Sequence, residues 1–268
     1  MRSVAAIAGI AGLCCGITIA QTGTIPRFDA ASIKRSVSDS DTFLKAHPGG
    51  RIEISRANLQ MLTALAWRLQ PFQVAGGPAW VRAEYFDVRT KAADSPSEDQ
   101  LFAMLQALLK ERFSMKLHFE TAERPVYMLK PGKTGRTPPT GLQVSTEGGC
   151  IHADAASPSD PNACGSLGMG FNHLEAHEIS MARFAEALTR VVDRKVIDRT
   201  GRAEKFNISL KWLPDAEQAL PASDAIPLPP DTPSLFTALR EQLGLKLESG
   251  KAAVELLVID HAEMPGEN

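Results

Sequence analysis

The sequence has little of several features that would narrow its function. Its 29 Lys and Arg residues are balanced by 31 Asp and Glu residues, so the basic excess typical of nucleic-acid-binding proteins is absent. Aromatic residues make up only 6% of the chain, and after residue 20 no apolar run approaches the ~20 residues of a membrane-spanning helix. Hydrophobic residues nevertheless reach 44% of the 268 residues, which is typical of a folded globular chain and not of a disordered one.

The N-terminal segment, residues 1–20, has the pattern of a secretory signal peptide. Arg2 supplies a short positive region, and an uncharged, mostly apolar run follows it as far as Ile19. Small residues precede the expected cleavage site, which lies between Ala20 and Gln21. A membrane anchor is the alternative, but the run is short for a span and rich in Gly and Ala. The pattern predicts an exported protein, periplasmic or extracellular, with no membrane span in the mature chain.

Cysteine is scarce, and cleavage removes two of the four cysteines, so that Cys150 and Cys164 remain in the mature chain. In an oxidising compartment such a pair is expected to form a disulfide, here closing a loop of about 15 residues. The alternative is two free thiols in a flexible segment. A zinc site on these cysteines is not supported, because only His152 lies nearby and no Cys-x-x-Cys spacing occurs.

Two stretches of the mature chain are similar to one another at a constant offset. Residues 105–118, LQALLKERFSMKLH, align without a gap with residues 235–248, LFTALREQLGLKLE. A shorter match joins residues 82–86 to residues 202–206 in the same order along the chain. Two ordered matches favour an internal repeat.

The hydrophobic periodicity predicts the same order of elements in each half, β-α-β-β-α-β-β. The clearest signals are helices capped by Asn58 and by Ser180. A capping box at Ser97 opens another helix, and Thr232 is expected to cap the last one. Each half ends in two expected strands. In the first half residues 126–129 are expected to be the hairpin partner of residues 115–119, and in the second half residues 253–259 are expected to form a central strand. We therefore expect an α+β protein with two related βαββαββ lobes, each with a mostly antiparallel sheet and two helices.

The composition sets the expected boundaries of these parts. Residues 1–20 form the signal peptide, residues 21–130 the first lobe and residues 169–268 the second lobe. Residues 131–168 are rich in Pro, Gly, Ser and Thr, so they are expected to form a linker loop that contains the disulfide.

The best candidate for chemistry is the stretch from His173 to His177, which reads HLEAH. On a strand the side chains of His173, Glu175 and His177 share one face, and two imidazoles with a carboxylate are suitable ligands for zinc. The alternative is the solvated face of an ordinary strand, because short patterns of this kind often match by chance.

Other patterns give little support to catalysis. The neighbouring Asp260 and His261 point to opposite faces of a strand, and no Gly-x-Ser-x-Gly sequence supplies a nucleophile. We therefore assign no catalytic residues and no cofactor beyond the zinc considered above. Trp80 follows a Gly-Gly-Pro turn and is a candidate ligand-binding residue, although packing over a sheet edge is the more common role of such a Trp.

Five stretches of the chain carry a family resemblance. They are residues 28–34, 48–51, 76–80 and 196–201, and the longest is 234–268. These stretches resemble a group of exported proteins, expanded as paralogues in soil Acidobacteria, that have no assigned function. Arg202 and Glu204 stand where members of that group usually carry Leu and Gly. Similar domains are attached to membrane metallopeptidases of the antibiotic-sensing type, so the resemblance implies a sensing or binding role and supplies no catalytic residues.

These features predict an exported, non-catalytic binding or interaction module of the cell envelope or the extracellular space. Its expected partner is a small ligand or an envelope protein, and nucleic acid is not expected. The alternative is an extracytoplasmic metal-dependent enzyme that uses His173, Glu175 and His177. A structural component of the envelope is a third interpretation.

Overall fold

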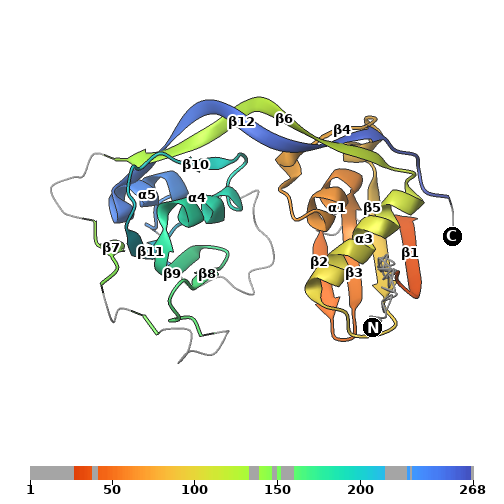
Figure 1. The fold of residues 1–268 in the computed structure, drawn as a ribbon, viewed down its shortest axis with the longest axis horizontal. Helices are drawn as coiled ribbons and strands as arrows, with labels where there is room; N and C mark the ends of the chain where they lie inside the picture. Colours follow the sequence, from red (N-terminus) through yellow and green to blue (C-terminus); the bar gives the residue numbers. More distant parts are fainter. Residues whose placement is uncertain are drawn as a thin grey trace, which may run out of the picture.

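A computed structural model describes residues 27–37, 42–132, 139–146, 150–151, 160–214, 228–229 and 231–266. The expected signal peptide and its cleavage site at Ala20 and Gln21 lie outside the described residues. The described chain forms two lobes joined along one side by a long ribbon of two strands (Figure 1). None of its helices is both long and apolar enough to cross a membrane. The class is α+β, as the sequence predicts.

The first lobe packs helices against one face of a four-stranded sheet with the strand order β1-β5-β3-β2. Its elements are β1 (Ala30–Arg35), β2 (Phe43–His47), β3 (Arg51–Asn58), α1 (Leu59–Ala66), α2 (Trp80–Ala83), β5 (Tyr85–Lys91) and α3 (Glu98–Arg112). All its strand pairs are antiparallel. Because side chains alternate between the faces of a sheet, Ile54 and Val88 are buried while Arg89 between the inward positions is exposed.

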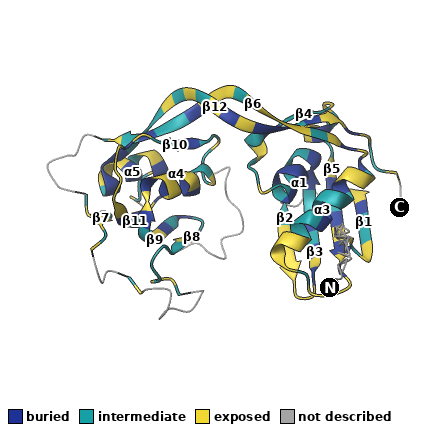
Figure 2. Ribbon diagram, viewed as in Figure 1, coloured by how far each residue is buried: buried dark blue, intermediate teal, exposed yellow. Residues whose placement is uncertain are grey.

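The second lobe has the same kind of plan, with the strand order β7-β11-β9-β8 and antiparallel pairing throughout. Its elements are β7 (Leu142–Val144), β8 (Leu167–Met169), β9 (His173–Ser180), α4 (Met181–Thr189), β11 (Lys205–Lys211) and α5 (Leu235–Leu243). Buried residues in each lobe gather where the helices meet the sheet (Figure 2).

The local signals for helix starts hold well. Asn58, Ser97 and Ser180 each accept a hydrogen bond from the backbone N–H three residues later, as expected of N-caps. The last helix begins later than expected: its N-cap is Ser234 and not Thr232. The Thr232 hydroxyl instead donates to a backbone carbonyl three residues earlier, at 2.7 Å, so it belongs to the preceding turn.

The largest departure from the sequence prediction concerns the strands that end each half. In each half the two expected strands are one continuous strand: β6 runs over Lys116–Pro131, where a hairpin is expected, and β12 over Leu245–His261. The two strands pair with one another, antiparallel, along nearly their whole length. Residues 120–125 contain no Gly, Asn or Asp to form a tight turn, and the partner strand satisfies their backbone groups.

The long ribbon exchanges strands between the lobes. The short strand β4 (Val74–Gly76), which follows a 3-10 turn at Pro71–Gln73, pairs in parallel with the end of β12. In the other lobe β10 (Val196–Asp198) pairs in parallel with the end of β6. Each short strand thus joins the long strand that comes from the opposite half of the chain, giving a sheet with the order β10-β6-β12-β4.

The hydrophobic cores follow this exchange. Leu129 of β6 lies in the core of the second lobe, and Ile259 of β12 lies in the core of the first lobe. A third, small cluster contains Val126, Val254 and Leu256 at the middle of the ribbon, where side chains of β4 and β10 pack against it. The middle of the ribbon therefore has a core of its own.

The connection between the lobes is β6 itself. Residues 131–168, which the sequence predicts as a linker, contain β7 and β8, and both strands pair with the second lobe. In the same segment Cys150 and Cys164 form the predicted disulfide, with 5.0 Å between their Cα atoms. The described part of this segment is therefore attached to the second lobe.

Candidate functional site

The sheet of the first lobe has an open face, because its described helices cover only the opposite face. Side chains that point to the open face form rows across the strands. In one row Ala30 of β1 pairs with Lys91 of β5, and His47 of β2 pairs with Arg51 of β3. The register of β3 on β5 places Arg51 level with Lys91, so two cations stand side by side.

A second row lies one step along the same strands. Ser32 and Glu53 both pair with Arg89, and Lys45 of β2 pairs with Glu53. Lys34 continues the outward face of β1 and is paired in register with Asp87. The open face of the first lobe therefore carries more cations than carboxylates.

The two carboxylates of this face are already engaged. Glu53 accepts a hydrogen bond from Arg89 at 3.1 Å. Asp87 accepts hydrogen bonds from the backbone N–H of Arg56 at 2.9 Å and from the hydroxyl of Ser55 at 3.3 Å. Neither carboxylate is left to neutralise the row of cations beside it.

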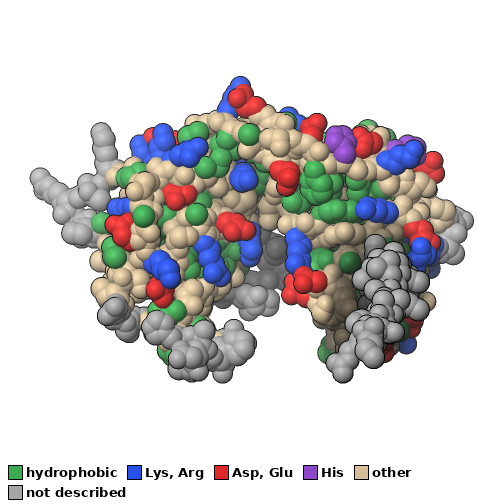
Figure 3. Space-filling view, in the orientation of Figure 1, with side chains coloured by type: hydrophobic (Ala, Val, Ile, Leu, Met, Phe, Trp, Pro, Cys, Tyr) green, Lys and Arg blue, Asp and Glu red, His purple; other side chains and the backbone are tan. Residues whose placement is uncertain are grey.

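A hollow of about 590 Å³ lies in this face, between β1, β3 and β5. The side chains of Ala30 and Ser32 are small and leave this part of the face low. The charged residues that line the hollow are Arg51, Glu53, Arg89 and Lys91, three cations and one carboxylate. Within the described part of the chain neither Arg51 nor Lys91 forms an ion pair, so their charges are open to solvent. By contrast, the face seen in Figure 3 intersperses cations and carboxylates.

The predicted zinc ligands lie on the corresponding face of the second lobe. Leu174 and Ala176 are buried, so His173, Glu175 and His177 point outward together. Their ligand atoms do not gather: in the described ranges, the one group of three candidate ligand atoms within 4.8 Å of one another is Cys150, Cys164 and Glu178. Because those two cysteines form the disulfide, they supply no thiolate for a metal.

Hydrogen bonds hold two of the predicted zinc ligands apart from a common point. Glu175 accepts a hydrogen bond from the Ser209 hydroxyl at 2.7 Å, and the Nδ1 atom of His173 lies 3.2 Å from the side-chain oxygen of Asn172. The ring of His173 also fills the space that a side chain at Gly170 would need. The side chains of Glu175 and His173 are therefore held by neighbouring residues and not directed at a shared metal position.

The zinc site that the sequence predicts can be tested directly by calorimetry. We expect zinc added at micromolar concentration to give no binding heat with the wild-type protein, since three ligand atoms do not converge. The variant His173→Asn, which keeps a polar side chain at this position, is the matched control. A micromolar heat that this substitution abolishes contradicts the expectation and restores the metal site.

The strands β3 and β9, which precede the first capped helix of each lobe, contain a bulge at corresponding positions. Arg56 in β3 and Glu178 in β9 have positive φ angles of 50° and 54°. The backbone N–H of Arg56 donates to Asp87, and that of Glu178 donates to the side-chain oxygen of Asn207 at 3.0 Å. The polar residue on the neighbouring strand thus supports this conformation in each lobe.

Trp80 packs into the first lobe. Its ring stacks on Phe113 with 6.2 Å between ring centroids, and it meets Phe86 edge to face at 6.4 Å. The ring is half-buried against the core of this lobe. These contacts account for a Trp after the Gly-Gly-Pro turn by packing alone.

The sequence of this chain matches the model of a protein family. The model describes a protein of unknown function, DUF3738, and matches residues 60–262. The chain belongs to the DUF3738 family. The match runs from α1 to the residue after β12, so it covers the second lobe, the ribbon and the part of the first lobe from α1 onward. The strands β1, β2 and β3 precede the matched residues. No curated protein and no solved structure matches the chain.

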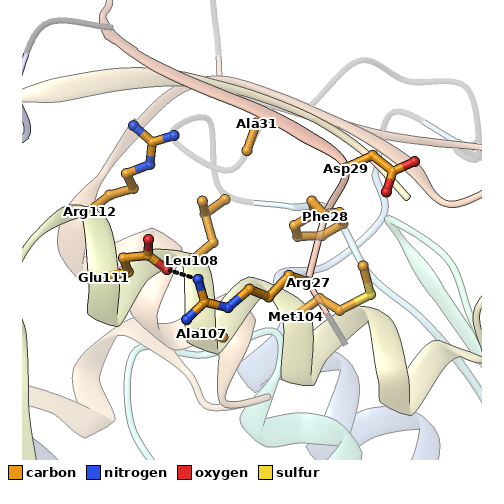
Figure 4. A pocket seen from close by; sticks show the side chains of 9 residues that line it. All are labelled: Arg27, Phe28, Asp29, Ala31, Met104, Ala107, Leu108, Glu111 and Arg112. Carbon is orange, nitrogen blue, oxygen red and sulfur yellow. Dashed lines mark ion pairs between the residues drawn. The ribbon is translucent and has the colours of Figure 1, made fainter. Parts of the chain in front are cut away.

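A second concavity of this chain lies between the start of β1 and α3, with a volume of about 150 Å³ (Figure 4). An ion pair of 3.1 Å between Arg27 and Glu111 crosses it, and Met104 and Leu108 of α3 line its wall. This space is small, and its paired charges neutralise one another. It is therefore less suited to an extended ligand than the hollow on the sheet.

The two ends of the DUF3738 ribbon carry equivalent charge pairs. In the first lobe the Nδ1 atom of His118 lies 2.9 Å from an oxygen of Asp260. In the second lobe Lys130 donates to Glu248 at 2.7 Å, and hydrogen bonds from Lys130 and Lys246 lower the pKa of Glu248 to about 2. Each pair joins β6 to β12 across the ribbon.

The His118 pair gives a prediction for pH. The hydrogen bond to Asp260 raises the pKa of His118 above its ordinary value, so the pair stabilises the folded state in acid. This contribution is complete below the unfolded-state pKa of His and is lost as the pH rises through the raised value. NMR titration of the His118 ring should therefore have a midpoint above that of free His. The variant Asp260→Asn should lower it, and an unchanged midpoint refutes the coupling.

Proposed function

We propose that this DUF3738 protein is an exported, non-catalytic binding module that uses the open sheet face of its first lobe. The observation that carries this proposal is the hollow of about 590 Å³ on that face, lined by Arg51, Arg89 and Lys91. Binding sites are typically concave and contain a few polar groups that converge. The two engaged carboxylates leave this hollow with an excess of positive charge.

The surroundings of the histidines support binding over catalysis. In the part of the chain that the structure describes, the His–carboxylate pairs are His47–Glu53, His118–Asp260, His118–Glu120 and His261–Glu263. The His side chains in these pairs are 41–49% exposed. Water competes with catalytic hydrogen bonds at such positions, whereas enzymes enclose their reacting groups.

Export is supported by the N-terminal pattern and by the disulfide. Structural disulfides persist in oxidising compartments, and Gly165, the residue after Cys164, donates to the carbonyl of His177 in the second lobe. The protein produced from its full-length gene should therefore be recovered from the periplasm or the medium, with Gln21 as its first residue. Intact-mass measurement checks this, and a cytoplasmic product that retains residues 1–20 contradicts it.

The similar plans of the two lobes support an internal repeat within this module. Both lobes have a leading strand with a bulge, a capped helix, a short strand that joins the ribbon, another strand, a second helix and a long strand. The family match covers the second lobe, the ribbon and the first lobe from α1 onward, so we infer that the two lobes act as one unit.

A panel of ligands tests the binding function. Protein recovered after export is heated with metals, sugars, peptides and cell-wall fragments, and the melting temperature is recorded. A ligand that binds only the folded state must raise that temperature, by an amount that grows with its concentration. A flat response across the panel, together with no partner crosslinked in envelope extracts, contradicts the proposal.

A further inference from the structure

We propose that the hollow of the first lobe binds an extended acidic peptide segment of a protein partner, through Arg51, Arg89 and Lys91. This inference rests on the proposed binding function and names the class of its ligand. The three cations come from two strands, and the register of β3 on β5 brings them to one face.

The first argument is the unbalanced charge of the row. Arg51 stands level with Lys91, and like charges directly opposite one another on a sheet are destabilising. The nearest carboxylate of this face, Glu53, is held by Arg89 at 3.1 Å. An anion that lies between Arg51 and Lys91 relieves this repulsion without breaking an existing ion pair.

The second argument is shape. Ala30 and Ser32 have small side chains, so the long side chain of Lys91 has room to bend over β1 toward a ligand on the sheet. The Arg89 side chain lies on the other side of the hollow, toward Glu53 of β3. The guanidinium groups present planar donor pairs that fit a carboxylate. The hollow therefore combines an accessible floor with donors of the right geometry.

The third argument is spacing. Arg89 and Lys91 are two residues apart on one strand, and alternate side chains of an extended chain recur about every 6.6–6.8 Å. An extended peptide with acidic residues at alternate positions repeats at the same interval. Its carboxylates then meet Arg89 and Lys91 in turn, and Arg51 reaches the one nearest Lys91.

The amount of charge favours a short acidic segment over a nucleic acid. The whole chain has a net charge of −2, and Glu53 and Asp87 lie on the same face as the cations. Glu53 lines the hollow itself, and a long polyphosphate meets further repulsion from Asp87 once it extends past the hollow. A peptide with a few carboxylates fits within the hollow.

The test measures binding of a labelled peptide with Asp and Ser in alternation, and of its Asn–Ser counterpart. The variant Arg51→Gln with Lys91→Gln removes two cations from the hollow. The control, Lys211→Gln with Lys251→Gln, removes two exposed cations elsewhere. We expect the hollow variant to bind the acidic peptide about tenfold more weakly and the control to bind it as the wild type does. Raising the salt from about 0.05 M to about 0.5 M should weaken wild-type binding.

The outcomes separate this inference from the binding function. Equal weakening in both variants, or no weakening in the hollow variant, overturns the site. Equal wild-type binding of the acidic and neutral peptides, or tighter binding of duplex DNA, overturns the ligand class. In each case a ligand found in the thermal panel leaves the binding function standing. A failed peptide, a flat panel and no partner crosslinked in envelope extracts together refute both.

Discussion

Replacing Leu129 by Ala should destabilise the second lobe, and replacing Ile259 by Ala should destabilise the first. Each residue lies in the half of the sequence opposite to the lobe whose core it fills, and both are buried, at 0% and 2% exposure. A buried Leu or Ile that is cut to Ala leaves a cavity, and the expected loss is roughly 2–5 kcal/mol of the free energy of unfolding. Hydrogen exchange followed by mass spectrometry reads out each lobe separately.

The two variants should differ in which amides lose protection against hydrogen exchange. In Leu129→Ala the amides of β9, α4 and β11 should exchange faster, whereas in Ile259→Ala the amides of α1 and β5 should do so. A matched control is Lys251→Ala in the middle of the ribbon, because its side chain is 72% exposed and should change neither lobe. If Leu129→Ala loosens the first lobe and spares the second, the strand exchange is wrong.

The exchange could not be predicted from the sequence, for a physical reason. The alternation of Leu117 and Phe119 with charged neighbours is typical of a strand, and the sequence predicts this correctly. Alternation fixes which side chains share a face, but it does not name the partner strand. The partner of β6 is β12, in which Leu247 pairs with Leu129 from a position 118 residues later, and no local pattern encodes that contact.

Helix starts are a different case, because their determinants are local. The side chains of Asn58, Ser97 and Ser180 bond to backbone groups three residues away, so the sequence alone contains the interaction. The start at Ser234 was missed by two residues since Thr232 makes a competing bond within the preceding turn.

In the candidate sites, too, the local features could be predicted from the sequence and the contacts between strands could not. The common face of His173, Glu175 and His177 follows from the period of a strand, but the distances between their ligand atoms depend on neighbouring strands. The basic hollow was missed because its cations are about 40 residues apart in the chain, at Arg51 and Lys91. The alternation of charged with buried residues in β3 and β5 was the available signal, and only the register joins the two.

Loss of the disulfide should give the other large effect. The double variant Cys150→Ser with Cys164→Ser should lose about 3 kcal/mol of stability in the chain-entropy model, because the closed loop has a sequence separation of 14 residues. The Cys150 sulfur lies 3.1 Å from a carboxylate oxygen of Glu178, next to the bulge of β9. Chemical denaturation with and without a reducing agent measures the change.

The effect should also be local, because the residues that follow Cys164 are hydrogen-bonded to β9, the strand that carries the predicted zinc ligands. Gly165 donates to the carbonyl of His177 at 2.8 Å, and the N–H of His177 donates to the carbonyl of Ser166 at 3.1 Å. Opening the loop should therefore speed hydrogen exchange at His177 and leave β3 in the first lobe protected. The reducing agent should not change the stability of the double variant, which serves as the control. If reduced and oxidised wild-type protein unfold at the same denaturant concentration, the disulfide does not stabilise this lobe.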